Sequence, residues 1–173
     1  MALDEELRRR REEIARLHID SENRHAYDEA LATFEHPRYE MYGDGEVFDG
    51  PEEVAEFYEG MRAGFPNRHD ELLSLQHADD AVITEFEASG THLGSYRGLP
   101  PTGRTFSCRM LSLLEFEPGT DRLVVERVYY DTATIQRQLG LAHDPLTLAG
   151  RVATVVNHPL TIGRGILRGV IGR

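Results

Sequence analysis

The pattern of apolar and polar positions divides the chain into a helical part and a strand-rich part. Before residue 66, apolar residues recur at the spacing of amphipathic helices, and two short strand-like runs flank a Gly-Asp-Gly turn at 43–45. The expected helices span 4–17, 21–34 and 51–65. From residue 68 the period becomes two, which is typical of half-buried strands. The expected strands span 70–77, 80–92, 104–117 and 122–130.

Helices followed by an antiparallel meander predict an α+β domain. The chain has 173 residues and 40% hydrophobic content, which is enough for one core but gives no sign of a second. Two strand rows that alternate toward one side carry the expected lining of the core or of a pocket. They are Val82, Thr84, Phe86, Ala88, Gly90 and His92, and Phe106, Cys108, Met110, Ser112, Leu114 and Phe116.

The opposite side of the expected sheet remains apolar at several positions. These are Leu111, Leu113, Val124 and Val128. A free sheet face is normally more polar than this, so we expect a homodimer that buries these side chains.

Composition excludes several classes of function. The net charge of -11 argues against a nucleic-acid partner, because phosphates attract basic surfaces. All 19 basic residues are arginine, so Schiff-base chemistry on a lysine is excluded. The single Cys108 excludes an internal disulfide, and the spacing of His69 and His77 matches no metal motif. We expect no cofactor and no metal, and, without a leader or a membrane-length apolar run, a cytoplasmic protein.

The last 33 residues differ from the rest in charge. Residues 1–140 have a net charge of -14, whereas residues 141–173 have +3. Asp144 and Pro145 are expected to cap a helix through about Val156, and the remainder alternates small apolar residues with arginine. Such a tail could dock on a membrane or a partner, or fold back on the acidic body. Because its charge is small and its glycines weaken a free helix, we expect 144–170 to pack on the protein.

A long loop with prolines and glycines follows the row that ends in His92. It is much longer than a tight hairpin, and its prolines give it order without a core, so we expect it to form the rim of a pocket. Asp131, after the last expected strand, suits a helix N-cap, but in an apolar cavity it would serve as a general acid or base. Tyr129 and Tyr130 point to opposite faces, so only one of them can share that cavity.

The stretch GTHLGSYRGLPPTGRTF at 90–106, followed by DRLVVERVYYDTATIQRQLG at 121–140, resembles the SnoaL-like polyketide cyclases of the nuclear-transport-factor-2-like superfamily. FDGPEEVAEFYEGMRAGFPN at 48–67 also fits. The resemblance covers 21–140. It leaves residues 1–20 as an N-terminal helical extension and 141–173 as a C-terminal amphipathic helical extension.

This resemblance implies a cone-shaped, cystatin-like curved antiparallel sheet wrapped around the N-terminal helices, with an apolar pocket and a dimeric assembly. Characterised members close rings by intramolecular aldol condensation without metal or cofactor, using an aspartate at the position of Asp131. His92 is expected to polarise a substrate carbonyl or enolate.

We therefore expect a cyclase or isomerase that acts on a small hydrophobic carbonyl compound. Asp131 would take the proton, and His92 with Tyr129 or Tyr130 would hold the oxyanion. Further candidate lining residues are Tyr27, Tyr42, Phe86, Met110 and Ser112. Two alternatives stay open: a non-catalytic protein that binds a hydrophobic ligand in the same pocket, and an interaction or membrane-associated module that uses the basic tail.

Overall fold

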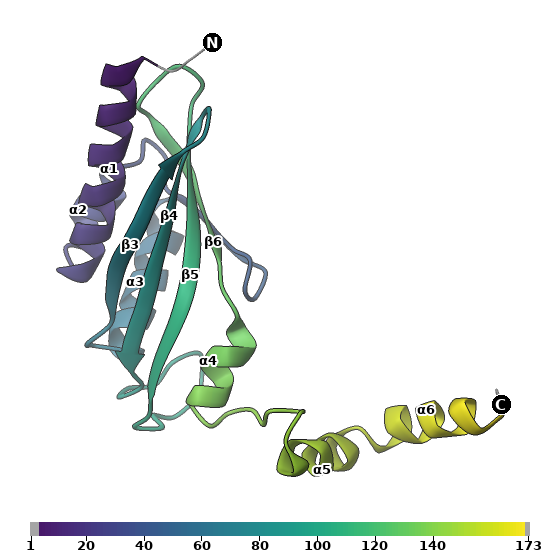
Figure 1. Cartoon of the computed structure of the whole chain (residues 1–173). Helices are drawn as coiled ribbons and strands as arrows, with labels where there is room; N and C mark the ends of the chain where they lie inside the picture. The colour runs from purple at the N-terminus through teal and green to yellow at the C-terminus, as the bar shows by residue number, and fades with distance from the viewer. Residues whose placement is uncertain (1–3, 172–173) are drawn as a thin grey trace.

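The computed structural model describes residues 4–171 and combines six helices with one six-stranded sheet in that range (Figure 1). The helices are α1 (Glu5–Asn23), α2 (Tyr27–Leu31), α3 (Pro51–Gly64), α4 (Thr132–Gln138), α5 (Leu148–Asn157) and α6 (Pro159–Ile171). The strands are β1 (Arg38–Met41), β2 (Glu46–Asp49), β3 (His69–His77), β4 (Ala81–Thr91), β5 (Thr105–Phe116) and β6 (Leu123–Tyr129). The α+β class and the four long strands are confirmed.

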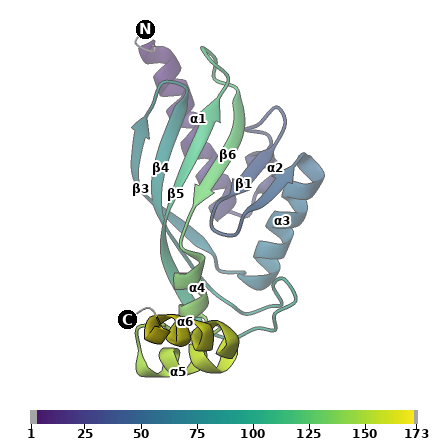
Figure 2. The ribbon, with the colours of Figure 1, turned by 90° about the vertical axis from the view of Figure 1, so that its right-hand side faces the viewer.

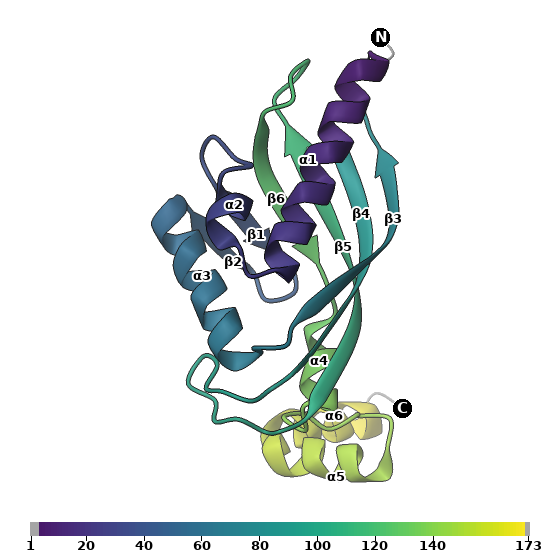
Figure 3. The same ribbon diagram turned by 90° about the vertical axis from the view of Figure 1, so that its left-hand side faces the viewer.

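The sheet is curved and open, with the strand order β2-β1-β6-β5-β4-β3. Helices α1, α2 and α3 cover one face (Figure 3), and no helix of the described chain covers the other face (Figure 2). Most neighbouring strands are antiparallel as expected, but β1 pairs with β6 in parallel. The reason is that β1 follows the first two helices and enters the sheet beside the last strand rather than beside β3.

The alternation along β4 and β5 places the predicted rows in the core. Phe86 lies opposite Met110, and Ala88 opposite Cys108, and all four side chains are buried. His92 follows β4 at the same parity and is also buried. The expectation for these two strands is confirmed.

The alternation along β6 changes at a bulge, and this corrects one prediction. Leu123 pairs with Phe116 but Val125 with Glu115, so Val124 is an extra residue that bends the strand. Val124 stays exposed, whereas Glu126 and Val128 are buried. Val128 was expected on the outer face, and that expectation is wrong because strict alternation fails at the bulge.

The first helix is longer than predicted. The second helix was expected to begin at Ser21, but Ser21 is buried inside α1, and the chain breaks instead near His25, whose φ is 55°. The expected boundary at residue 20 falls within α1. Arg11 and His18, from the expected extension, are buried against the sheet side of the molecule. These residues therefore contribute to the core of the body.

The C-terminal helices leave the body, and the expectation that they pack on it is wrong. In Figure 1, α5 and α6 extend from the base of the molecule beyond α4. Leu148, Val152 and Leu160 are 81%, 57% and 75% exposed. Helix α5 begins after Thr147, whose Oγ1 accepts the Gly150 N–H at 3.0 Å, later than the expected Asp144 cap. Within 4–171 no helix is long and apolar enough to cross a membrane.

Candidate active site

A cavity of about 180 Å³ is enclosed by residues of α1, α3, α4 and four strands of the sheet. Its wall is mainly aromatic and thioether: Tyr39, Met41, Phe57, Phe86, Phe106 and Met110. Besides tyrosines, the titratable side chains that line it are Glu22, Asp44, Arg68, His92, Arg97 and Glu126. An apolar enclosure with few polar groups is typical of a small-molecule site.

His92 presents an unpaired N–H group at this cavity. Its ring is 1% exposed and stacks on Phe65, with centroids 5.1 Å apart. The backbone N–H of Thr102 donates to Nδ1 at 3.3 Å, so the proton of the neutral ring lies on Nε2. Within residues 4–171, Nε2 is buried without a hydrogen-bond partner. A buried donor of this kind can bind a carbonyl oxygen or an enolate.

Glu22, near the C-terminal end of α1, places a carboxyl group at the same cavity. Tyr58 donates to its Oε1 at 2.9 Å and Tyr39 donates to the same atom at 3.3 Å. The other oxygen, Oε2, has no hydrogen-bond partner among the described residues. One oxygen of Glu22 is therefore held in place while the other is free to exchange a proton.

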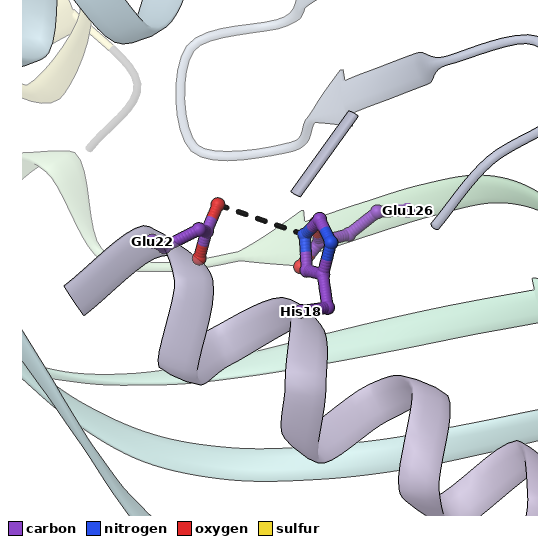
Figure 4. A group of neighbouring side chains, drawn as sticks. All are labelled: His18, Glu22 and Glu126. Carbon is purple, nitrogen blue, oxygen red and sulfur yellow. Dashed lines mark hydrogen bonds and ion pairs between the residues drawn. The ribbon is translucent and has the colours of Figure 1, made fainter. Parts of the chain in front are cut away.

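Beside Glu22 lies a buried pair formed by His18 and Glu126 (Figure 4). His18 Nε2 is 3.1 Å from Oε2 of Glu126 and 3.7 Å from Oε1 of Glu22. The His18 Nδ1–H donates to Thr33 Oγ1 at 2.9 Å, and the hydroxyl of Ser112 donates to Oε1 of Glu126 at 2.5 Å. The polar groups of this pair are thus satisfied within the protein.

These contacts shift the pKa of each member. Burial raises the pKa of Glu22 to about 7, although the charge of His18 works against that shift. Burial by itself lowers the pKa of His18, but the hydrogen bond to Glu126 and the charge of Glu22 raise it to about 9. Burial also opposes ionisation of Glu126, yet His18 and Ser112 hold its pKa below the ordinary value. At neutral pH, His18 is therefore a cation and Glu126 an anion. The neighbouring carboxyl group of Glu22 is close to half-protonated at this pH.

The same three side chains offer ligand atoms within 4.8 Å of one another, a spacing that a metal ion could span. Both nitrogens of His18 are hydrogen-bonded, and its positive charge already compensates Glu126. The donor set thus fits a site that holds protons better than one that holds a cation.

Polar residues from three loops meet at the rim of the cavity. The Tyr130 hydroxyl donates to Oδ2 of Asp44 at 2.8 Å, and Arg97 pairs with the same oxygen at 2.7 Å. Arg97, Tyr96 and Leu99 belong to the proline-glycine loop and line the cavity. The expectation that this loop forms a pocket rim is confirmed.

Asp131 does not reach the cavity, and this corrects the predicted placement. Its side chain is exposed at the N-cap of α4, where Oδ1 accepts the Ala133 N–H at 2.9 Å and Oδ2 accepts the Thr134 hydroxyl. Arg137 lies 3.5 Å away. The Thr134 hydrogen bond, with the neighbouring backbone N–H groups, lowers the pKa of Asp131. The carboxylate of Asp131 therefore serves as the N-cap of α4.

The other predicted residues divide between the cavity and the remaining surface. Phe86, Met110 and Tyr130 line the cavity. Ser112 is buried and supports Glu126 from the side. Tyr42 and Tyr129 stack on each other at 4.5 Å and are 55% and 41% exposed, outside the cavity wall.

Tyr27 lies on the far side of Tyr58, with parallel rings 4.4 Å apart. It lines a small depression that adjoins the cavity, and it does not line the cavity itself. Local sequence patterns did not identify Glu22, His18 or Glu126 as site residues. The only local signal for the first two was their four-residue spacing on one helix, which places them on one face.

Several solved structures share the fold. IdmH of Streptomyces antibioticus, described as a candidate polyketide cyclase, is 23% identical with a TM-score of 0.61, covering 75% of this chain and 98% of its own. A protein from Catenulispora acidiphila with a ketosteroid isomerase-like fold is 20% identical with a TM-score of 0.62, covering 75% and 93%. A candidate polyketide cyclase from Xanthomonas campestris is 18% identical with a TM-score of 0.67, covering 76% and 98%.

No curated protein sequence matches the chain. The family model described as SnoaL-like polyketide cyclase matches residues 12–139, a range that includes every residue of the cavity wall named above. The chain belongs to the SnoaL-like polyketide cyclase family.

Proposed function

We propose that the chain is a cofactor-independent cyclase or isomerase for a small hydrophobic carbonyl compound, with Glu22 as the acid/base group. One observation carries this proposal: a carboxyl group with a free oxygen and an unpaired His92 N–H line the same apolar cavity. Family membership supports a cyclase-type role. A base whose pKa lies near neutrality, beside a donor for an oxyanion, suits proton abstraction next to a carbonyl.

The reaction needs no external oxidant or reductant. The Glu22 carboxylate takes a proton from the carbon next to the substrate carbonyl, and the electron pair of the broken C–H bond forms an enolate. The Nε2–H of His92 donates to the enolate oxygen. In ring closure, the enolate carbon forms a bond to a second carbonyl carbon of the same molecule, and the resulting alkoxide takes the proton back from Glu22. In isomerisation, the proton returns to a different carbon.

Tyr39 and Tyr58 hold Glu22 in position for this step. Burial raises the pKa of both phenols well above the ordinary value, so they remain donors across the working range of pH. Their hydrogen bonds reach one oxygen of Glu22 and leave the other for the substrate. The proposed reaction thus uses Glu22 as the base and His92 as the donor to the oxyanion. The two tyrosines keep Glu22 in its orientation.

A non-catalytic binding protein is the second candidate, and the role of Asp131 favours it. Asp131 stands at the position of the family's catalytic aspartate, but here its side chain caps α4. If turnover has been lost along with that placement, the apolar cavity would serve only to hold a ligand.

Proton exchange distinguishes the two functions without knowledge of the natural substrate. The probe is a panel of small cyclic ketones and 1,3-diketones in D₂O, with deuterium uptake next to the carbonyl followed by NMR. Wild-type protein is expected to accelerate exchange, and Glu22→Gln to reduce the rate about 10²- to 10⁴-fold. Asp131→Asn is the matched carboxyl-to-amide control and should retain the rate. Equal rates in wild type and Glu22→Gln would reject the enzyme and leave the binding protein.

A further inference from the structure

The two C-terminal helices carry a surface that the body does not cover. In α5, the exposed Leu148, Val152 and Val155 recur at the spacing of one helix face, with Val156 beside them. In α6, Leu160 and Leu167 lie two turns apart and are 75% and 60% exposed. These apolar side chains are exposed to water in the isolated chain, and their exposure next to one another is unfavourable.

Charge on this segment is of one sign. From residue 148 to residue 171, the chain has three arginines and no carboxylate, although the whole protein has 30 acidic residues. The arginines are Arg151, Arg164 and Arg168. All three are exposed, and none forms an ion pair within the part of the chain that the structure describes. In α6, Arg164 and Arg168 are four residues apart, so they share one side of the helix. This side lies next to the side that carries Leu160 and Leu167.

An apolar face bordered by arginines is the pattern of a helix that lies in a lipid–water interface. Anionic headgroups complement the arginines, and the acyl region accepts the apolar side chains. The acidic body, with a net charge of -14 over residues 1–140, is repelled by such a surface. The helices project beyond the body (Figure 1), and screening over about 8 Å at physiological salt weakens that repulsion with distance.

The position of the segment relates it to the cavity. Leu139 and Leu141 line the cavity, and α5 begins only seven residues after Leu141. Helix α4, the loop between β4 and β5, and both tail helices lie at the same end of the molecule (Figure 2). A surface that holds the tail would therefore lie near the rim of the cavity.

We propose that α5 and α6 form an interfacial arm that lies on an anionic lipid surface and holds the rim of the cavity close to it. The arm would give the cavity access to hydrophobic compounds dissolved in lipid. This proposal stands independently of any catalytic step, because binding of the arm to lipid requires neither Glu22 nor His92.

Vesicle flotation tests the arm. Full-length protein is expected to float with vesicles of phosphatidylcholine and phosphatidylglycerol, and the chain truncated after His143 is expected to remain at the bottom. Changing Arg151, Arg164 and Arg168 together to glutamine should weaken partitioning roughly 100-fold, since each arginine near an anionic surface contributes about five-fold. The matched control changes the exposed Arg8, Arg10 and Arg62 to glutamine and should bind like wild type.

Three outcomes would overturn the proposal: no flotation of the full chain, equal flotation of the truncated chain, or equal loss with the control arginines. The alternative is that the tail binds a second copy of this protein. Sedimentation of the full and truncated chains without lipid tests this by measuring their oligomeric states. If the tail raises the oligomeric state and vesicles bind neither chain, the surface belongs to a second copy of this protein and the lipid proposal is wrong.

Discussion

The Nε2 atom of His18 lies 3.1 Å from Oε2 of Glu126, in a part of the molecule where His18 is fully buried. The pair lies beside Glu22, whose carboxyl group reaches the cavity. A buried charge must be compensated, and this pair compensates itself while leaving Glu22 free to change its protonation state. The stability of the fold and the proposed chemistry therefore depend on the same group of side chains.

His18 should make the protein less stable as the pH rises. Its pKa is raised from 6.5 to about 9 on folding, so its contribution is complete below pH 6.5 and is lost as the pH increases to about 9. We expect a loss of about 3 kcal/mol in the free energy of unfolding across this window, measured by urea denaturation at a series of pH values. His18→Gln should be destabilised and should lack this part of the pH dependence. An unchanged slope in His18→Gln would contradict the assignment.

Arg11 should be a structural residue despite its charge. It is fully buried, donates to the carbonyl oxygens of Thr120, Asp79 and Glu117, and lies 5.0 Å from the ring centre of Phe116. Removal of the guanidinium leaves the carbonyls of Thr120 and Asp79 without a donor among the described residues, so we expect a cost of about 3 kcal/mol.

Urea denaturation of Arg11→Gln measures this cost. Arg10→Gln, at the neighbouring exposed position, is the control and should change stability by less than about 0.5 kcal/mol. Equal effects at both positions would show that burial of Arg11 is unimportant.

His92 should confer a preference for carbonyl ligands. Wild-type protein is expected to bind a small cyclic ketone about five-fold more tightly than the hydrocarbon of the same shape, because the ketone accepts the Nε2 proton. His92→Phe keeps a ring that can stack on Phe65 and removes the donor. We expect the variant to bind both compounds with similar affinity in calorimetry, and a retained preference would exclude His92 as the donor.

We also expect a homodimer formed through the outer face of the sheet. Leu111, Val124 and Tyr129 are 40%, 47% and 41% exposed, and no helix of the described chain covers the outer face of the sheet (Figure 2). Sedimentation should show a dimer at micromolar concentration and a monomer for Leu111→Glu combined with Tyr129→Glu. Leu17→Glu, at an exposed leucine of α1 on the opposite side of the sheet, serves as the control. A wild-type protein that is entirely monomeric would contradict this expectation.

Strand alternation was sufficient to predict the core rows of β4 and β5, since Phe86 and Met110 obey it without interruption. It failed in β6 because the bulge at Val124 reverses the faces that follow. Glu126 appeared to point outward for this reason, and a central member of the buried cluster was missed. The same bulge turns Tyr130 inward and leaves Tyr129 outside.

The role of Asp131 could not be decided from the sequence, because a strand end before a helix suits both a cap and a cavity acid. The structure shows the cap, with Ala133 and Thr134 as hydrogen-bond donors. Glu22 could not be identified from the sequence because Glu126, its neighbour in the cluster, is 104 positions away. The two come together only when α1 packs on the sheet. Local patterns carry no information about such a contact.

The ionisation of Glu22 is the most direct test of the proposed site. Burial in the cavity raises its pKa to about 7, a value at which the group can both take and return a proton. The measurement is an isotope-edited infrared titration of protein with labelled glutamate, with the Glu22→Gln spectrum subtracted. We predict a carboxyl band that disappears with a midpoint near pH 7. A midpoint near 4.5 would show an ordinary solvated carboxylate and contradict the proposed role of Glu22 as the acid/base group.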